Sequence, residues 1–165
     1  RGHAAVMFGN RMFILGGHDN RACFDDVFSA EVSEDGRIGE WVHTMPLPRP
    51  LIHFGVSEYN GRIYVFGGQD RNWKLRREVY SAAVSASELS SWRRERSFPM
   101  PQARMGVTVA DGCFVVAGGG YGWDSPVYSK IVCSAVDEDG TIGKWCKTGR
   151  LPKPLAFHSV VLVSE

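Results

Sequence analysis

A pair of glycines closes a run of apolar residues three times along this chain, at residues 12–17, 63–68 and 113–119. The first glycines of successive pairs are 51 residues apart. Downstream of each pair come a tryptophan and then a proline-bearing connection; the tryptophans are Trp41, Trp92 and Trp145. Three features that recur in one order at one period indicate a repeat protein, in which each unit buries its apolar face against the next.

Each copy is predicted to form four short strands. Strand A covers residues 3–8, 54–59 and 106–110, and strand B ends at the glycine pair. The turns between them are Gly9-Asn10, Asn60-Gly61 and Asp111-Gly112, and the last two are strong hairpin signals because both central residues adopt positive φ readily. Strand C covers residues 27–32, 79–84 and 131–136, and strand D carries the tryptophan. No segment of helical length shows a 3.6-residue period.

These features resemble the kelch repeat, whose marks are the double glycine, an aromatic residue downstream and a tryptophan beyond it. Phe28 and Tyr80 hold the aromatic place in the first two copies, whereas the third copy departs from the pattern with Val132. The resemblance covers the whole chain and implies blades of four antiparallel strands arranged radially about a channel. We therefore predict an all-β, kelch-type β-propeller of three four-stranded antiparallel blades plus the first strand of a fourth.

The predicted units are residues 1–50, 51–102 and 103–154, with 155–165 as the first strand of a further blade. Three blades form only a partial ring, because kelch propellers usually close with six or seven. An open ring exposes apolar blade faces and strand edges. Either the chain is a fragment of a longer propeller, or it is half of a six-bladed assembly, a homodimer of two copies.

Composition excludes several classes of function. The net charge of +1 gives no field that favours nucleic acid or a membrane surface, and no apolar run reaches the roughly 18 residues that span a bilayer. The four cysteines are not spaced as zinc ligands, and we expect free thiols in a reducing compartment, which favours the cytoplasm. No metal and no cofactor is predicted.

Three histidines stand at the start of predicted A strands: His3, His53 and His158. In kelch propellers this strand lines the central channel, so the resemblance implies that these imidazoles are channel-lining candidates. The simpler interpretation is that repeats inherit repeat residues and that a histidine there satisfies the backbone of a neighbouring blade. The third copy has Met105-Gly106 at that place, which breaks the ring of histidines.

The loops between strands B and C vary while the frame around them does not, and loops on a rigid scaffold commonly carry function. In kelch propellers they share one face with the D-to-A connections. They contain aromatic and basic residues of the types enriched at protein-binding hot spots. The partner-binding candidates are Arg21, Arg71, Trp73, Lys74, Arg76, Arg77, Tyr121 and Trp123. Because arginine pairs with carboxylates, the expected partner is a protein with an acidic segment. The alternative is that the tryptophans fold onto their own blades and the cations are solvated.

Some kelch propellers are enzymes, such as galactose oxidase and an epimerase of sialic acid, but their site residues cannot be mapped onto this chain. No catalytic triad, carboxylate pair or phosphate-binding glycine loop is recognisable, and Gly118-Gly119-Gly120 opens no helix. We therefore predict a non-catalytic protein-binding module, with part of a propeller enzyme as the alternative.

Overall fold

The computed structural model describes residues 1–86, 88–121 and 126–163, and its strands form three antiparallel sheets. The first sheet has the order β1-β2-β3-β4, with β1 (Ala4–Phe8), β2 (Arg11–Leu15), β3 (Val27–Glu31) and β4 (Val42–His43). The second contains β5 (Gly55–Tyr59), β6 (Arg62–Phe66), β7 (Val79–Ser85), β8 (Glu88–Leu89) and β9 (Arg93–Arg94), the last two both paired with β7. The third has the order β10-β11-β12-β13, with β10 (Gly106–Ala110), β11 (Cys113–Ala117), β12 (Lys130–Ala135) and β13 (Cys146–Arg150). The prediction of an all-β chain of antiparallel sheets is confirmed.

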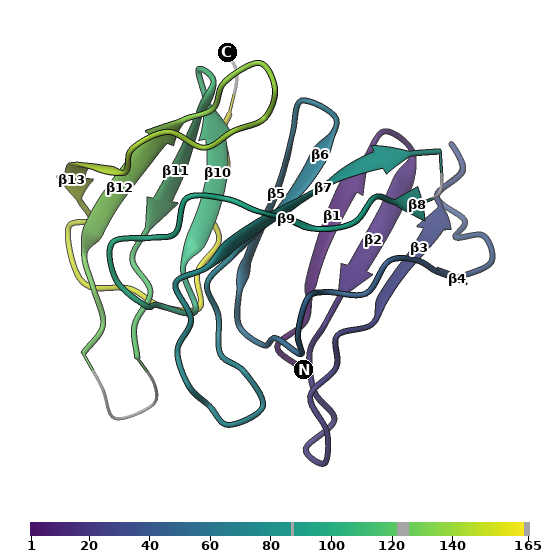
Figure 1. Ribbon diagram of the computed structural model, residues 1–165, viewed down its shortest axis with the longest axis horizontal. Coiled ribbons are helices and arrows are strands. Elements are labelled where there is room, and N and C mark those ends of the chain that lie inside the picture. Colours follow the sequence, from purple (N-terminus) through teal and green to yellow (C-terminus); the bar gives the residue numbers. More distant parts are fainter. Residues whose placement is uncertain (87, 122–125, 164–165) are drawn as a thin grey trace.

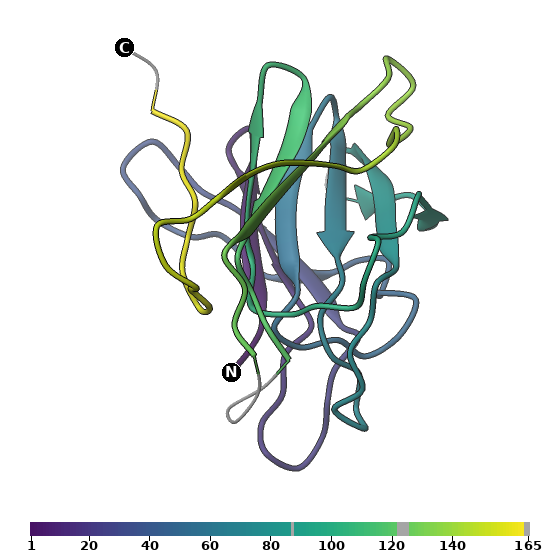
Figure 2. The same cartoon turned by 90° about the vertical axis from the view of Figure 1, so that its left-hand side faces the viewer.

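The three sheets stand face to face like an open fan (Figure 1). Strands β1, β5 and β10 are neighbours, β1 contacting β5 and β5 contacting β10. They therefore form the inner edge of the fan, and in Figure 2 they stand one behind another. Among the described residues there is no helix, and hence none that is long and apolar enough to span a membrane.

The turns of the A–B hairpins have the predicted backbone. Asn60 and Gly61 have φ values of 48° and 74°, and Asp111 and Gly112 have 48° and 71°. Two successive residues with positive φ give a turn whose twist matches that of the flanking strands. These two hairpins, β5–β6 and β10–β11, are thus set by local sequence.

The middle sheet is buried on both of its faces. Ile63 and Val65 of β6 belong to one apolar cluster with Phe13 and Leu15 of the first sheet. The alternate residues of the same strand, Tyr64 and Phe66, belong to a second cluster with Phe114 and Val116 of the third sheet. Because side chains of a strand alternate between the two faces, a strand between two neighbours must be apolar throughout. This is why the run before each glycine pair is continuous rather than alternating.

Each glycine pair lies where the backbone of the next repeat crosses close by. Gly67 and Gly68 have φ values of 56° and 93°, and the N–H of Gly68 donates to the carbonyl of Gln102 at 2.9 Å. A Cβ built on Gly67 would lie 2.5 Å from that carbonyl oxygen, so no other residue fits this crossing. The pair is required both by its backbone conformation and by this close approach.

The tryptophans connect each sheet to the one before it. Trp92 Nε1 donates to the carbonyl of Met45 at 3.4 Å, and Trp145 Nε1 donates to the carbonyl of Arg96 at 3.1 Å. Met45 and Arg96 are 51 residues apart, so the contact repeats with the sequence. The predicted equivalence of the tryptophans is confirmed, although each precedes the outer strand instead of lying within it.

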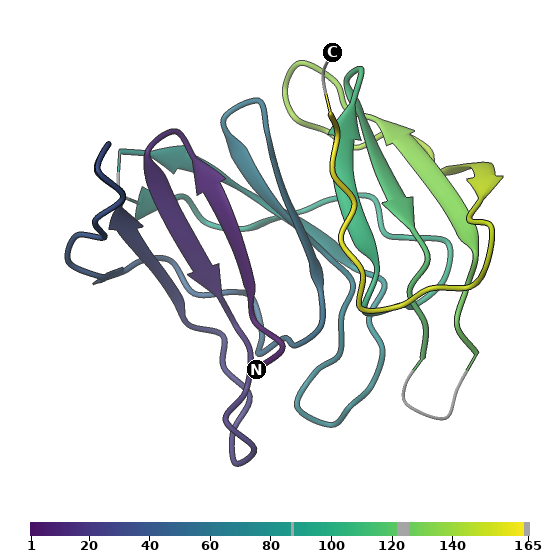
Figure 3. The ribbon, with the colours of Figure 1, turned by 180° about the vertical axis from the view of Figure 1, so that it is seen from behind.

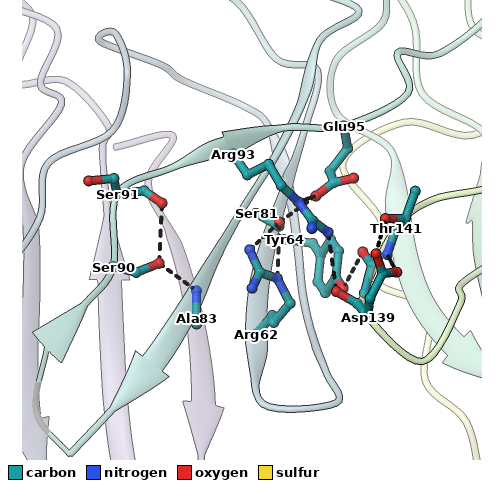
Figure 4. A network of polar contacts seen from close by, with 11 residues as sticks. Arg62, Tyr64, Ser81, Ala83, Ser90, Ser91, Arg93, Glu95, Asp139 and Thr141 are labelled. Carbon is teal, nitrogen blue, oxygen red and sulfur yellow. Dashed lines mark hydrogen bonds and ion pairs between the residues drawn. The ribbon is translucent and has the colours of Figure 1, made fainter.

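A polar network joins the outer parts of the second and third sheets (Figure 4). Buried Glu95 accepts from Ser81 Oγ at 2.6 Å and from Arg93 Nε at 2.7 Å. The hydroxyl of fully buried Tyr64 donates to the carbonyl of Gly140 at 2.9 Å. Burial raises the pKa of this tyrosine to about 12. The network satisfies polar groups that the stacked sheets remove from water.

The tail does not form the strand that the sequence predicts. Residues 151–163 carry no strand, because the described chain offers no following hairpin with which they could pair. The tail nevertheless lies beside β10 (Figure 3), and a Cβ built on Gly106 would overlap with Val160. A Cβ built on Gly55 would overlap with Val107 of β10 in the same way. The tail thus occupies the place of a next inner strand without its hydrogen-bonded ladder.

Among the described residues, the first sheet has a neighbouring sheet on one of its two faces. Phe28 is 39% exposed, whereas Tyr80, which lies at the equivalent position of the second sheet, is 8% exposed. Both follow a buried valine that opens the third strand of the sheet. The difference in exposure reflects the neighbouring sheet that covers Tyr80.

Candidate binding face at the loop end

The described parts of the three loops, residues 16–26, 67–78, 118–121 and 126–129, lie at the same end of the fan (Figure 1). The connections between repeats reach this end as well, since the N–H of Leu51 donates to the carbonyl of Phe24, and the N–H of Gln102 donates to that of Arg76. The loops and the connections therefore form one continuous face, which we call the loop face.

Both acidic residues at the tips of the first two loops are used within their own loops. Asp19 Oδ1 accepts from the N–H groups of Ala22 and Arg21, each at 2.8 Å, and these bonds lower the pKa of the carboxyl. Asp70 accepts from the N–H groups of Asn72 and Lys74. These two carboxylates fix the shape of their loops and do not compensate neighbouring surface cations.

Arg76 also belongs to the structure of the second loop. Its guanidinium pairs with Asp70, and the two side chains are 23% and 8% exposed. Burial alone would raise the pKa of Asp70, but hydrogen bonds from the Asn72 N–H and from Arg76 outweigh it, so the pKa is lowered. Because this guanidinium is already occupied, Arg76 is not among the free cations of the loop face.

Trp73 is a large exposed side chain of the loop face. It is 53% exposed and has φ of 59°, a left-handed conformation that costs energy for a bulky residue. Gln69 Nε2 donates to its carbonyl at 3.2 Å. The indole ring lies 5.8 Å from the His18 ring and 6.4 Å from the His53 ring, measured between centroids. The ring is thus about half exposed and borders His18 of the first repeat and His53 of its own.

A hollow of about 610 Å³ opens beside Trp73, between the first two loops. Its lining includes His18, His53, Arg21 and Arg71. Burial lowers the pKa of both histidines, so the imidazoles are neutral at pH 7 and the arginines carry the charge. The hollow combines an aromatic wall with a cationic rim.

Four residues at equivalent places form a collar that links the repeats at this end: Gly2, His53, Arg104 and Phe157. Their φ values are 69°, 55°, 61° and 59°. The N–H of each donates to the carbonyl of the one before it: His53 to Gly2 at 2.8 Å, Arg104 to His53 at 2.8 Å and Phe157 to Arg104 at 3.0 Å. The same backbone geometry thus displays four different side chains at the inner end of the loop face.

The collar side chains contact one another and Trp73. The His53 and Phe157 rings meet edge to face at 5.6 Å, and the guanidinium carbon of Arg104 lies 4.9 Å from the centre of the Phe157 ring. Arg104 is only 5% exposed. A buried arginine, two aromatic rings and an imidazole therefore form one cluster beside the hollow.

The three histidines predicted to line the channel occupy two different positions. His53 belongs to the collar, whereas His3 and His158 come one position after collar residues. His158 is packed near Gly106 and Gly118, and both of its ring nitrogens are buried without a hydrogen-bond partner among the described residues. Across the described ranges no three histidine, cysteine or acidic side chains are grouped so as to hold a metal.

The other predicted candidates are on the surface. Arg21, Arg71, Lys74 and Arg77 are exposed. Tyr121 is 41% exposed, and its ring contacts that of Tyr128 at 6.0 Å. Trp123 lies outside the described residues.

Arg104, Phe157 and His18 were missed by the sequence interpretation. The sequence does contain a signal for Arg104. Counting 51 residues back and forward from His53, which is the offset of the glycine pairs, leads to Gly2 and to Arg104. Aligning histidine with histidine instead placed His3 and His53 in one set and hid the true equivalence.

Comparison with known proteins supports the kinship suggested by the repeats. Residues 2–165 match the model of the KLHDC2/KLHL20/DRC7 Kelch-repeats domain. Beta-scruin of Limulus polyphemus is 28% identical over 95% of the chain, and Kelch-like protein 36 of Bos taurus is 26% identical over 94%. The chain spans only 17% and 24% of the length of these two relatives.

The fold has a close counterpart among solved structures. The structure of YjhT superposes on 96% of this chain with a TM-score of 0.75 at 13% sequence identity, and the match covers 58% of that protein. Since the family match extends over almost all of the sequence, the chain belongs to the kelch-repeat family.

Proposed function

We propose that this chain is a non-catalytic protein-binding module that takes an acidic protein segment on its loop face. The observation that carries the proposal is Trp73: a large ring, more than half exposed, held in a strained backbone conformation beside arginines that have no carboxylate partner among the described residues. Exposed tryptophan next to arginine is the chemistry of protein-binding hot spots. Kinship with kelch-like proteins and scruins supports a role in protein interaction.

The rigid frame supports the same proposal. The loops stand on sheets with buried apolar cores, and loops on a rigid scaffold of this kind commonly carry binding residues. Arg21 and Arg71 line the hollow from two different loops, and arginine offers two parallel donors to a carboxylate. An acidic side chain can therefore be bound while an apolar neighbour packs on Trp73.

The test is capture of acidic peptides by the purified protein. The probe is a set of peptides rich in Asp and Glu, paired with versions in which Asn and Gln replace them. A combined Trp73→Ala and Arg71→Ala change is expected to weaken binding by about 2–4 kcal/mol and to alter folding stability by less than about 0.5 kcal/mol, because both residues are exposed.

Arg76→Ala is the matched control from the same loop. It is expected to lower thermal stability because it leaves buried Asp70 without its ion partner. Equal capture of acidic and neutral peptides, or unchanged capture after the double substitution, would contradict the proposal.

Completion of the ring stays a prediction, with residues 1–50, 51–102 and 103–154 as the blade units. In a six-bladed homodimer, β1 of a second copy would need the place beside β10 that the tail now holds. We expect light scattering to detect such a dimer only if the tail moves, and residues 1–154 should then associate more strongly than the full chain.

A further inference from the structure

Three cysteines lie in the third sheet, one on each of its last three strands. Cys113 belongs to β11, Cys133 to β12 and Cys146 to β13, and all three are free thiols. Val132 packs against the core shared with the second sheet, and side chains alternate along a strand. Cys133 therefore points to the opposite face, on which no further sheet packs among the described residues.

Cys133 and Cys146 are directly opposite each other. The register pairs Cys133 with Cys146 and Val132 with Lys147, so the ladder is regular at this point. Opposite residues of an antiparallel pair point to the same face, and their Cα atoms are about 4.5–5.5 Å apart. A disulfide needs Cα atoms about 4.4–6.8 Å apart. The two thiols thus have the spacing of a disulfide without any change of register.

The third cysteine shares the face but lies further away. The residue opposite Cys133 on β11 is Val115, and Cys113 precedes Val115 by two residues. Such diagonal neighbours are about 7–8 Å apart, and Cα atoms more than about 7 Å apart cannot be bridged without backbone movement. Cys146 is therefore the disulfide partner of Cys133, and Cys113 is an internal control on the same face.

The repeat does not require cysteine at these positions. Ser29 and Ser81 hold the place of Cys133 in the first two sheets, because each also lies opposite the third residue of the second strand. The residues opposite these serines on the next strand are Val42 and Arg93. The facing thiols are thus a feature of the third repeat and not of the frame that the three repeats share.

We propose that Cys133 and Cys146 form a reversible redox modification site, at which a small disulfide such as oxidised glutathione converts the two thiols into one disulfide. β13 is the outer strand of its sheet and pairs with β12 only among the described strands (Figure 1). The new bond would join these two strands covalently. The site lies on the sheet and not on the loop face, so it is independent of the proposed function.

Exposure sets the order of the two exchange steps. Cys146 is exposed and Cys133 is partly buried, and thiol–disulfide exchange depends on access to the attacking sulfur. The Cys146 thiolate attacks oxidised glutathione, forms a mixed disulfide and releases one reduced glutathione. The Cys133 thiolate then attacks the Cys146 sulfur and releases the second. Two protein thiols are oxidised, and the glutathione disulfide takes up their two electrons and two protons.

The test is treatment of the purified protein with oxidised glutathione, followed by alkylation of the remaining thiols, digestion with trypsin and mass spectrometry. Trypsin cuts after Lys144, so the disulfide would link peptides 131–144 and 145–147. We expect this linked pair to be the main product and to disappear after reduction with dithiothreitol. The melting temperature of the oxidised protein should rise by up to about 10 °C, because the bond closes a short loop in the unfolded chain.

Matched serine variants separate the three thiols. Cys113→Ser should leave the linked pair and the rise in melting temperature unchanged, whereas Cys146→Ser should abolish both. In concentrated urea Cys133 should also link to Cys113, because loop closure depends only weakly on loop length once the sheet is lost. Preference for Cys146 is therefore expected in the folded protein only.

Three results would overturn the inference. A bond between Cys133 and Cys113 in the folded protein would mean that the register does not select the partner. Glutathione retained on Cys146 would mean that Cys133 does not reach the mixed disulfide. A lower melting temperature of the oxidised protein would mean that the bond forms only by distorting the sheet.

Discussion

The tryptophans give a direct measure of what a neighbouring sheet contributes to stability. Trp145 packs against the preceding sheet and is 8% exposed, whereas no preceding sheet covers Trp41 among the described residues and it is 39% exposed. They hold equivalent places in their repeats. Replacing each by alanine therefore compares one position with and without its neighbour.

The expected difference follows from the contacts of Trp145. About a third of the side-chain surface, or about 50–80 Å², is covered in Trp145 but not in Trp41, which corresponds to about 1–2 kcal/mol. The hydrogen bond from Nε1 to the Arg96 carbonyl adds about 1 kcal/mol. The contact with Phe98, at 4.6 Å between ring centroids, adds about 0.5–1.5 kcal/mol. Trp145→Ala should cost about 3 kcal/mol more than Trp41→Ala.

The assay is urea denaturation followed by far-ultraviolet circular dichroism, which does not depend on tryptophan fluorescence. Trp145→Phe is a milder variant that keeps an aromatic ring and removes the donor, and it should lose about 1–2 kcal/mol. Equal losses for Trp41→Ala and Trp145→Ala would refute the reasoning, because Trp41 would then be as well covered as Trp145.

Three further predictions concern the interface between the second and third sheets. Gly55→Ala should lower the free energy of unfolding by about 1–3 kcal/mol, because the new Cβ overlaps with Val107. In a double-mutant cycle measured by urea denaturation, the variant that carries both Gly55→Ala and Val107→Ala should lose less stability than the two single variants added together. Glu95→Gln should cost about 1–3 kcal/mol in the same assay, since it weakens two charge-assisted bonds, while the exposed Glu34→Gln should cost almost nothing. The pKa of Tyr64 is raised to about 12, above the value of about 10 in an unfolded chain. The stabilisation of the folded state by the neutral Tyr64 side chain is therefore complete below pH 10, and it declines by about 1.4 kcal/mol per pH unit between pH 10 and 12. Tyr64→Phe should lack this decline when the free energy of unfolding is measured against pH.

Much of the fold could be predicted because each repeat is specified locally. Asn60-Gly61 and Asp111-Gly112 set their hairpins through backbone preference alone, and the glycine pairs mark the ends of the second strands. The short β8 (Glu88–Leu89) was not predicted, because two residues carry no pattern. The tail was predicted as a strand because it repeats the pattern of residues 3–8, but a strand also needs a partner, which the described chain does not supply.

The candidate site was less accessible to sequence reasoning. Trp73 was identified because the fold does not require an aromatic residue there, and its exposure agrees with that interpretation. Arg76 was grouped with the free cations because composition cannot distinguish it from Arg71, whereas the structure pairs it with Asp70. Arg104 looks like part of a proline-flanked connection in the sequence. Only the structure shows that its Nε and Nη1 atoms are buried without a hydrogen-bond partner among the described residues.

The collar has a consequence for how such chains diversify. Its hydrogen bonds run through main-chain atoms only, so the path of the backbone is the same whether the residue is Gly2, His53, Arg104 or Phe157. The side chain at this position differs from copy to copy, within the limits that left-handed backbone sets. Each repeat thus carries one position at which the main chain joins neighbouring repeats while the chemical group at the inner end of the loops varies.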